Sequence, residues 1–259
     1  MSIRLWDRAA GLPVRAGDRP RPEIVALQIE LPTVEELFRF MRDAERRFET
    51  LRMRIQERVV ATRGEQIKQI EVMLRHPGFA RVTTSEPALG TSGNYELWLS
   101  DGTTVRTYSG FHRVGTKRPV RRIVSGLDNP DLPGMSTVYR PLTSLPKETL
   151  PEVFIHPAGF CQNVLGTGVC WIAGATDQAG REAIVLECDH PRAIEVWADR
   201  PQHHLQVTVD RETGVITRLI ELMGDLVTRD AEVTTLEPDG PLPPSAFEFT
   251  FPSDATMLF

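Results

Sequence analysis

Asn94-Tyr95-Glu96-Leu97-Trp98-Leu99-Ser100 is followed by Asp101-Gly102 and then by Thr103-Thr104-Val105-Arg106-Thr107-Tyr108. An Asp-Gly pair between two such runs favours a two-residue hairpin turn. A second hairpin is predicted where residues 204–209 turn through 210–214 into residues 215–220. Short hairpins of this kind fill most of the chain after residue 50. They predict one antiparallel sheet in which each strand lies beside the next.

One long amphipathic helix precedes the hairpins, and it is predicted from about Thr33 to Thr50. Thr33 stands at the N-cap position, and Glu36 completes a capping box. The apolar residues at helical spacing are Leu37, Phe40, Met41, Ala44, Phe48 and Leu51. From Leu51 onward the hydrophobic period changes from about 3.6 to 2, which predicts that strands begin there.

The predicted fold is mainly β (α+β). It is a single large curved antiparallel sheet, an incomplete β-barrel of about 10–11 strands, with the N-terminal amphipathic helix and short helices against its concave face. Residues 1–32, which contain four prolines, are predicted to form an extended N-terminal arm. Residues 33–259 are predicted to form a single half-barrel domain.

Two later segments do not follow the pattern of short hairpins. The proline-rich stretch from about 111 to 165 predicts a long excursion with short helical turns that covers part of the sheet. The last extended segment, Ala246–Pro252, alternates three phenylalanines with polar residues, and we expect the three rings to face one side.

Composition limits the classes of function. The net charge of −5 argues against broad nucleic-acid binding. No window approaches the roughly 18 apolar residues of a membrane span. The N-terminus shows no signal-peptide pattern, so a cytoplasmic protein is expected, whereas a trimmed chain would point to the cell envelope or periplasm.

The helix 35–50 runs directly into the strand 51–62, and Leu97–Gly102 follows two further strands. In the C-terminal half, residues 205–210 precede residues 213–218, and the turn 242–246 precedes Phe247–Pro252. This order, over roughly residues 33–252, resembles the LolA-like outer-membrane lipoprotein carrier family. That group includes the RseB-like regulators and the mycobacterial lipid-binding lipoproteins. The resemblance implies an incomplete barrel whose hollow binds acyl chains, or serves as a docking and sensing surface.

Apolar side chains on the helix stripe and on inward strand positions predict a hydrophobic ligand cavity. The residues predicted to line it are Leu37, Phe40, Met41, Phe48, Met53, Ile55, Val72, Leu74, Leu97 and Leu99. For any one of them a filled core is the more usual role, so the hypothesis concerns the group. Burial of about ten acyl methylenes would contribute about 8 kcal/mol before ordering costs.

The densest basic cluster contains Arg118, Arg121 and Arg122. Such a cluster can meet the phosphate groups of a lipid or an acidic protein partner, and it is also common in solvated loops. These three arginines are therefore the candidate partner-docking residues.

Histidines and cysteines give no convincing catalytic or metal-binding set, and no cofactor is predicted. His190 lies near Cys188 and Asp189, but nothing else completes a ligand set. Cys170 and Cys188 lie on the two arms of one hairpin and could approach each other, and Cys161 could reach either. In a reducing cytosol free thiols are the default.

The sequence thus favours a non-enzymatic binding protein that holds a lipid or other hydrophobic ligand in the half-barrel. One alternative is a regulatory domain of RseB-like type that docks a protein partner. A third alternative is a hydrolase-like enzyme that uses histidine and cysteine residues between about 156 and 190.

Overall fold

The computed structural model of this protein describes residues 27, 31–61, 64–89, 94–120, 141–189, 191 and 202–258. Most of the predicted N-terminal arm, together with Arg121, Arg122 and His190, lies outside these ranges. The division into an arm and a single domain therefore stays a prediction.

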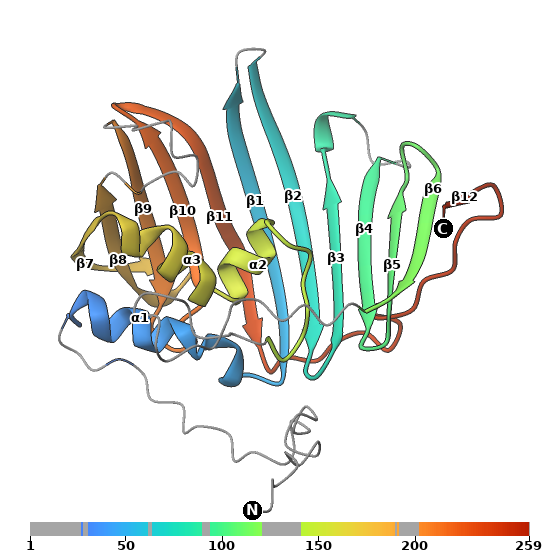
Figure 1. The fold of residues 1–259 in the computed structure, drawn as a ribbon, viewed down its shortest axis with the longest axis horizontal. Helices are drawn as coiled ribbons and strands as arrows, with labels where there is room; N and C mark the ends of the chain where they lie inside the picture. The colour runs from blue at the N-terminus through green and yellow to red at the C-terminus, as the bar shows by residue number, and fades with distance from the viewer. Residues whose placement is uncertain are drawn as a thin grey trace, which may run out of the picture.

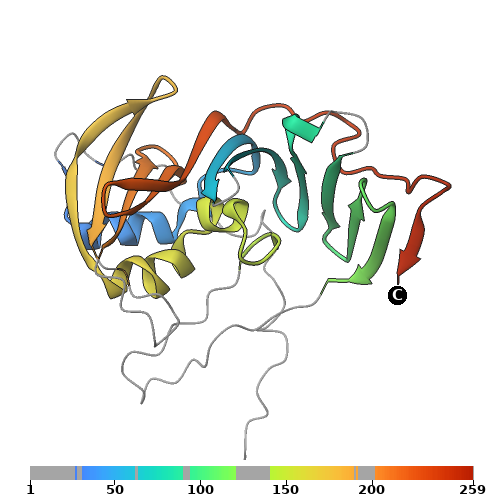
Figure 2. The ribbon, with the colours of Figure 1, turned by 90° about the horizontal axis from the view of Figure 1, so that it is seen from above.

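Twelve strands form one open, curved sheet (Figures 1 and 2). In chain order they are β1 Thr50–Ala61, β2 Gly64–Arg75, β3 Phe79–Ser85, β4 Tyr95–Asp101, β5 Thr104–Ser109, β6 Val114–Pro119, β7 Val169–Gln178, β8 Arg181–Asp189, β9 His203–Asp210, β10 Ile216–Met223, β11 Leu226–Pro238 and β12 Thr256–Leu258. Their order across the sheet is β12-β6-β5-β4-β3-β2-β1-β11-β10-β9-β8-β7.

The curved sheet predicted from the sequence is confirmed, with two differences. The strand β6 lies inside the segment predicted as a proline-rich excursion, where it pairs with β5. The last strand, β12, pairs with β6 in parallel, so one pair of the sheet is not antiparallel. Because each strand of the meanders β1–β6 and β7–β11 pairs with the next along the chain, the two meanders need only one long-range pairing, that of β1 with β11.

The N-terminal helix is shorter than predicted. It occupies Val34–Arg42 (α1), and the predicted capping box is present, with Thr33 Oγ1 accepting a hydrogen bond from the Glu36 backbone N–H at 3.2 Å. A 3₁₀ turn, η3 Ala44–Arg46, follows it. Arg47 donates to the Phe40 carbonyl at 2.8 Å and lies over the Phe40 ring, so its side chain caps the helix end where the prediction continued the helix.

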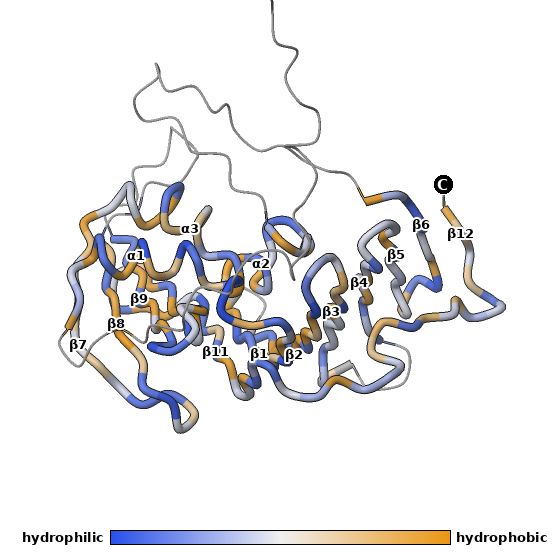
Figure 3. The backbone as a smooth tube through the Cα atoms, turned by 90° about the horizontal axis from the view of Figure 1, so that it is seen from below, coloured by the Kyte–Doolittle hydropathy of each residue, from blue (hydrophilic) through white to orange (hydrophobic). Residues whose placement is uncertain are grey.

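Three helices lie on the concave side of the sheet: α1, α2 Leu150–Ile155 and α3 Ala158–Asn163 (Figure 2). This confirms the short helices expected there. The main hydrophobic core lies between these helices and the strands, and Figure 3 shows hydrophobic residues gathered in this part of the molecule. Phe154 and Ile155 of α2 are fully buried within it.

The C-terminal residues 239–255, which we call the strap, cross the convex face from the end of β11 to β12. Arg81 donates to the carbonyls of Ala246 and Glu248, and the Phe247 ring lies 5.5 Å from the Phe79 ring. Farther along, Phe249 and Phe251 pack with Leu97, Leu99 and Tyr108 in a second hydrophobic cluster.

The predicted one-sided arrangement of the three strap phenylalanines is found, although the segment is not a strand. Phe247, Phe249 and Phe251 are half-buried, whereas Glu248 and Thr250 between them are exposed. Ring packing and the two bonds from Arg81 hold this segment, which begins in a turn where the Ala246 N–H donates to the Pro243 carbonyl and the Glu248 N–H to the Ser245 carbonyl. The alternation of apolar and polar residues therefore indicated its buried side correctly without indicating strand pairing.

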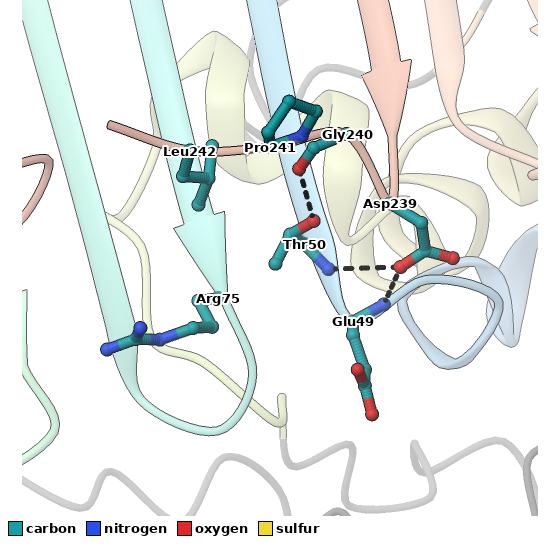
Figure 4. Close-up of a pocket in the computed structure, with 7 residues that line it drawn as sticks. All are labelled: Glu49, Thr50, Arg75, Asp239, Gly240, Pro241 and Leu242. Atoms are coloured by element: carbon teal, nitrogen blue, oxygen red, sulfur yellow. Dashed lines mark hydrogen bonds between the residues drawn. The ribbon is translucent and has the colours of Figure 1, made fainter. Parts of the chain in front are cut away.

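A tight junction marks the start of the strap (Figure 4). Asp239 Oδ1 accepts hydrogen bonds from the backbone N–H groups of Glu49 (2.7 Å) and Thr50 (3.3 Å), and the Asp239 N–H donates to the Thr50 carbonyl. Thr50 Oγ1 donates to the Gly240 carbonyl. Asp239 has a φ of 55°, a left-handed conformation that its carboxylate bonds stabilise here.

Gly115 of β6 lies directly beneath the strap. A Cβ at this position would lie 2.5 Å from Phe251 Cε1 and 3.0 Å from the Met257 sulfur. We expect Gly115→Ala to lower the free energy of unfolding by about 1–3 kcal/mol, because overpacking displaces the ring. Chemical denaturation measures the effect.

The matched control is Gly159→Ala in α3, where a new Cβ would meet nothing within 4 Å. That substitution should stabilise the protein slightly, by up to about 1 kcal/mol, through helix propensity. Equal denaturation midpoints for wild type and Gly115→Ala would show that the strap does not pack on Gly115.

Candidate functional site

Strand register assigns residues to the two faces of the sheet. Val72 of β2 lies opposite Val82 of β3, and Val82 lies opposite Trp98 of β4. Since Val72 and Val82 belong to the main core, Trp98 shares the concave face with them. The helices lie over the other half of this face, as Figure 2 shows.

The concave side of β4–β6 carries a small surface, which we call the open concave face. Its residues, assigned by register from Trp98, are Trp98, Val105, Thr107, Thr116 and Arg118. Trp98 is half-buried and packs against the main core, and Val105 is buried. The hydroxyls of Thr107 and Thr116 bond to each other at 2.7 Å, so these polar groups satisfy one another.

Eight of the ten residues predicted to line a cavity are buried on the concave side or in the helix that covers it. Seven of them form part of one core cluster: Leu37, Met41, Phe48, Met53, Ile55, Val72 and Leu74. Phe40 is also buried, and the Arg47 guanidinium lies over its ring, 3.9 Å from the ring centroid. The structure thus brings these residues together, and they pack against one another.

Leu97 and Leu99 lie on the opposite face of the sheet from the other eight. Leu97 is paired with Thr83 and Leu99 with Arg81, on the convex side, where the strap covers them. The run Leu97-Trp98-Leu99 is apolar at every position, so its alternation does not reveal which residues point inward. Trp98, which sequence reasoning did not select, takes the concave position.

A shallow depression of about 620 Å³ opens at the junction of β1 with the strap (Figure 4). It is lined by Glu49, Thr50, Arg75, Asp239, Gly240, Pro241 and Leu242. None of the residues predicted to line a cavity contributes to it. The Arg75 guanidinium stacks on Phe79 and Phe247, at 4.5 and 5.2 Å from the ring centroids, so its side chain helps to hold the strap.

A buried polar cluster connects η3 with the segment before α2. Glu45, which is 2% exposed, accepts hydrogen bonds from the Leu142 backbone N–H at 2.9 and 3.1 Å, and its carboxylate lies 3.1 Å from His156 Nε2. His76 Nδ1 lies 2.8 Å from Thr143 Oγ1, which also accepts from the Gly78 N–H. The cluster thus fixes residues 142–143 on the lower end of the sheet.

Burial lowers the pKa of His76 from its ordinary value to about 4. Glu45 and Asp239 oppose this shift, and His156 adds to it. The His76 ring also stacks on Phe48 at 5.5 Å. The folded protein therefore favours neutral His76.

His204 on the convex face lies between two carboxylates. Its Nδ1 is 2.6 Å from Asp189, and its Nε2 bonds to Glu187. Burial opposes protonation, but the bonds to Asp189 and Glu187 raise the pKa of His204 overall. Asp189 thus bonds to His204 on the convex face, whereas Cys188 lies on the concave face, and His190 lies outside the described residues.

The cysteines have partners other than histidine among the described residues. The Cys161 thiol donates to Met41 Sδ at 3.8 Å, and burial raises its pKa to about 12. Cys170 and Cys188 both donate to the Leu165 carbonyl. None of these three thiol hydrogen bonds has a histidine as its partner.

Of the three candidate docking residues, only Arg118 lies in the ranges that the structure describes. Arg118 is exposed on the open concave face, and it forms no ion pair with any residue that the structure describes. In the described ranges no group of three or more histidine, cysteine or acidic residues can hold a metal ion. No helix in those ranges has the length and apolar composition needed to cross a membrane.

Several solved structures resemble this chain. MucB aligns over 83% of this chain and 62% of its own, with 13% identity and a TM-score of 0.47. MucB has also been solved in complex with MucA from Pseudomonas aeruginosa, with a TM-score of 0.48 over 83% of this chain and 60% of that one. The chain thus spans about three fifths of the length of MucB.

Other similar structures align with this chain over almost their whole length. A LolA superfamily protein from Nitrosomonas europaea aligns over 85% of this chain and 99% of its own, with 11% identity and a TM-score of 0.34. LprF from Mycobacterium bovis aligns over 86% and 99%, with 10% identity and a TM-score of 0.37. The solved structures similar to this chain include a LolA superfamily protein. No family model and no curated protein matches the chain.

Neutral His76 makes stability depend on pH. The unfolded chain binds a proton near pH 6.5 and the folded protein only near pH 4, so stability is full above about pH 6.5 and falls as the pH drops towards 4. The loss attributable to His76 is about 3 kcal/mol by pH 4.

We expect His76→Asn to flatten this part of the pH profile, because the Asn amide can still bond to Thr143 without taking up a proton. Urea denaturation at several pH values between 4 and 7 measures the slope. His112→Asn, at an exposed histidine, should leave the slope unchanged. The same slope in His76→Asn as in wild type would contradict the assignment.

Proposed function

We propose that this chain is a non-enzymatic binding protein that holds a lipid or other hydrophobic ligand against the open concave face. The observation that carries the proposal is the position of Trp98, which is half-buried on the concave side at the margin of the main core. The separate partners of the described cysteines and histidines support a role without catalysis.

The chemistry of the open concave face suits an apolar ligand. Half-buried Trp98 offers apolar surface beside buried Val105, and the mutual hydrogen bond of Thr107 and Thr116 removes most of the cost of covering their hydroxyls. Burial of apolar surface contributes about 25 cal/mol per Å². An acyl chain or a similar group lying along this face would therefore gain free energy without leaving polar groups unpaired.

Arg118 adds a cation at the edge of the same face. It follows Thr116 by two residues on β6 and therefore points to the same face, so a ligand that covers Thr107 and Thr116 comes within reach of the guanidinium. Arginine binds carboxylates and phosphates in a two-pronged geometry. We therefore propose an amphiphile with an anionic head group as the ligand class.

The core residues that the sequence predicted to line a cavity lie at one end of the proposed site. Val72 lies in the same row of the sheet as Val82 and Trp98, so the row leads from the open concave face to the core under the helices. In the proposed complex the cluster that contains Leu37, Met41 and Val72 forms the closed end of the hollow.

A regulatory role with a protein partner is the second candidate function, and exposed Arg118 is the observation that favours it. An acidic partner segment would use Arg118 together with Arg121 and Arg122. The two candidates differ in one measurable respect: only a lipid site requires Trp98 and distinguishes ligands by their apolar tails.

Fluorescence titration with oleic acid tests the lipid proposal. Trp98→Ala should weaken binding about five- to tenfold, because about 50 Å² of apolar contact is lost. The matched control is Trp171→Ala, which removes a tryptophan that is 41% exposed on β7 and should leave the affinity unchanged. Equal losses in both variants, or none in Trp98→Ala, would contradict the proposal.

Arg118→Glu tests the anionic head group. It should weaken oleic acid binding, and it should leave the binding of the uncharged analogue oleyl alcohol within about twofold. Weakening of both ligands to the same extent would remove Arg118 from the site. Unchanged binding of both ligands would show that Arg118 does not contact the ligand, and it would favour the second candidate function for this residue.

A further inference from the structure

Two thiols face each other across the β7–β8 hairpin. Cys170 and Cys188 are directly opposed in register, and their neighbours Ile172 and Leu186 are opposed two residues farther along. Both cysteines lie on the concave side, because Cys188 is also opposite Leu205 of the core. Cys188 is fully buried, and Cys170 is half-buried on β7, the terminal strand of the sheet.

The two sulfur atoms converge on one acceptor. Cys170 Sγ lies 3.2 Å and Cys188 Sγ 3.6 Å from the carbonyl oxygen of Leu165. Directly opposed residues in an antiparallel pair have Cβ atoms about 4.5–5.5 Å apart, and a disulfide needs about 3.5–4.5 Å. A small adjustment of the hairpin therefore brings the sulfurs to bonding distance.

We propose that Cys170 and Cys188 form a reversible cross-strand disulfide, in which Cys170 is the attacking thiol and Cys188 the resolving thiol. This site is separate from the open concave face and does not depend on ligand binding there.

Electrostatics assigns the two roles. When the Cys188 thiol turns from the Leu165 carbonyl to the adjacent Cys170 sulfur, its proton stabilises the thiolate there and lowers the pKa of Cys170, so Cys170 more readily becomes the thiolate. The same bond, together with burial, raises the pKa of Cys188. Exposure agrees with this order, since an oxidant in solution can reach half-buried Cys170 before fully buried Cys188.

The oxidant that this reaction requires is a small-molecule disulfide, such as oxidised glutathione. The Cys170 thiolate, having released its proton to water, attacks one glutathione sulfur, which forms a mixed disulfide and expels one glutathione thiolate. Cys188 then attacks the Cys170 sulfur, its proton leaves to water, and the second glutathione thiolate departs. The protein loses two hydrogen atoms, and the oxidised glutathione gains two electrons to become two thiols.

Oxidation changes the contacts of the turn beneath the hairpin. The Leu165 carbonyl loses both thiol donors and keeps the Gly168 N–H at 3.1 Å. Leu165 begins η5 Leu165–Thr167, which follows α3. The disulfide thus fixes the edge strand β7 to β8 and loosens the attachment of η5.

Cys161 is not a competing partner. Its thiol donates to Met41 Sδ, and its pKa of about 12 keeps it protonated. Cys161→Ala is therefore the matched control, because it removes a buried cysteine from the same region without touching the pair.

The experiment exposes the full-length, reduced protein to glutathione buffers of increasing oxidised fraction, followed by acid quenching, alkylation of free thiols and intact mass measurement. We expect loss of two hydrogen atoms with one alkylated cysteine, and a Cys170–Cys188 peptide pair after digestion. Cys161→Ala should form the same bond, and Cys188→Ser should instead accumulate one glutathione on Cys170. The oxidised wild type should melt several degrees higher than the reduced form.

Three results would overturn the proposal. The wild type could keep three alkylatable thiols, it could stop at the glutathione adduct, or its disulfide could contain Cys161. The decisive measurements use the wild-type chain, so a folding defect in a variant does not obscure them.

Discussion

The pairing of β1 with β11 is the constraint on which the rest of the structure depends. Each meander is built from neighbouring hairpins, and only this pairing joins them into one sheet. Charged side chains reinforce it on both faces: Arg229 binds buried Glu57 at 2.7 Å, and Arg58 lies 3.5 Å from Asp230. Asp239 completes it at the lower end by accepting the backbone N–H groups of Glu49 and Thr50.

Once β1 and β11 are in register, the residues that point to the concave face and those that point to the convex face are determined. Alternate residues of β1 and β2 point to the concave side, where the helices cover the apolar ones. On β4 and β5 the convex side is also apolar, and the strap covers it with Phe249 and Phe251. The concave side of these strands keeps Trp98 and Val105, which is why the candidate site lies at this end of the sheet.

Much of the fold could be predicted from the sequence, because hairpin turns and hydrophobic periods are local signals. Thr33 and Glu36 predicted the helix start correctly, but its end depends on Arg47 folding back onto Phe40, a contact that periodicity does not reveal. The run Leu97-Trp98-Leu99 is apolar throughout, so only the register with β3 decides which residues face the concave side. Thr107 and Thr116 became candidate site residues only because β6 pairs with β5, within a segment whose prolines concealed the strand.

The strap gives the sheet a mechanical property. It is anchored by Asp239 at one end and by the β12–β6 pairing at the other, and between these points it lies on the outside of the curve. If the arch closed further, the outer path between the anchors would lengthen, and the strap, whose turns at 243–248 and 252–255 are held by backbone hydrogen bonds, would come under tension. If the arch flattened, the strap would slacken. The strap therefore opposes closure more than opening, as an outer tie does on an arch, and it sets a lower limit on the radius of the hollow.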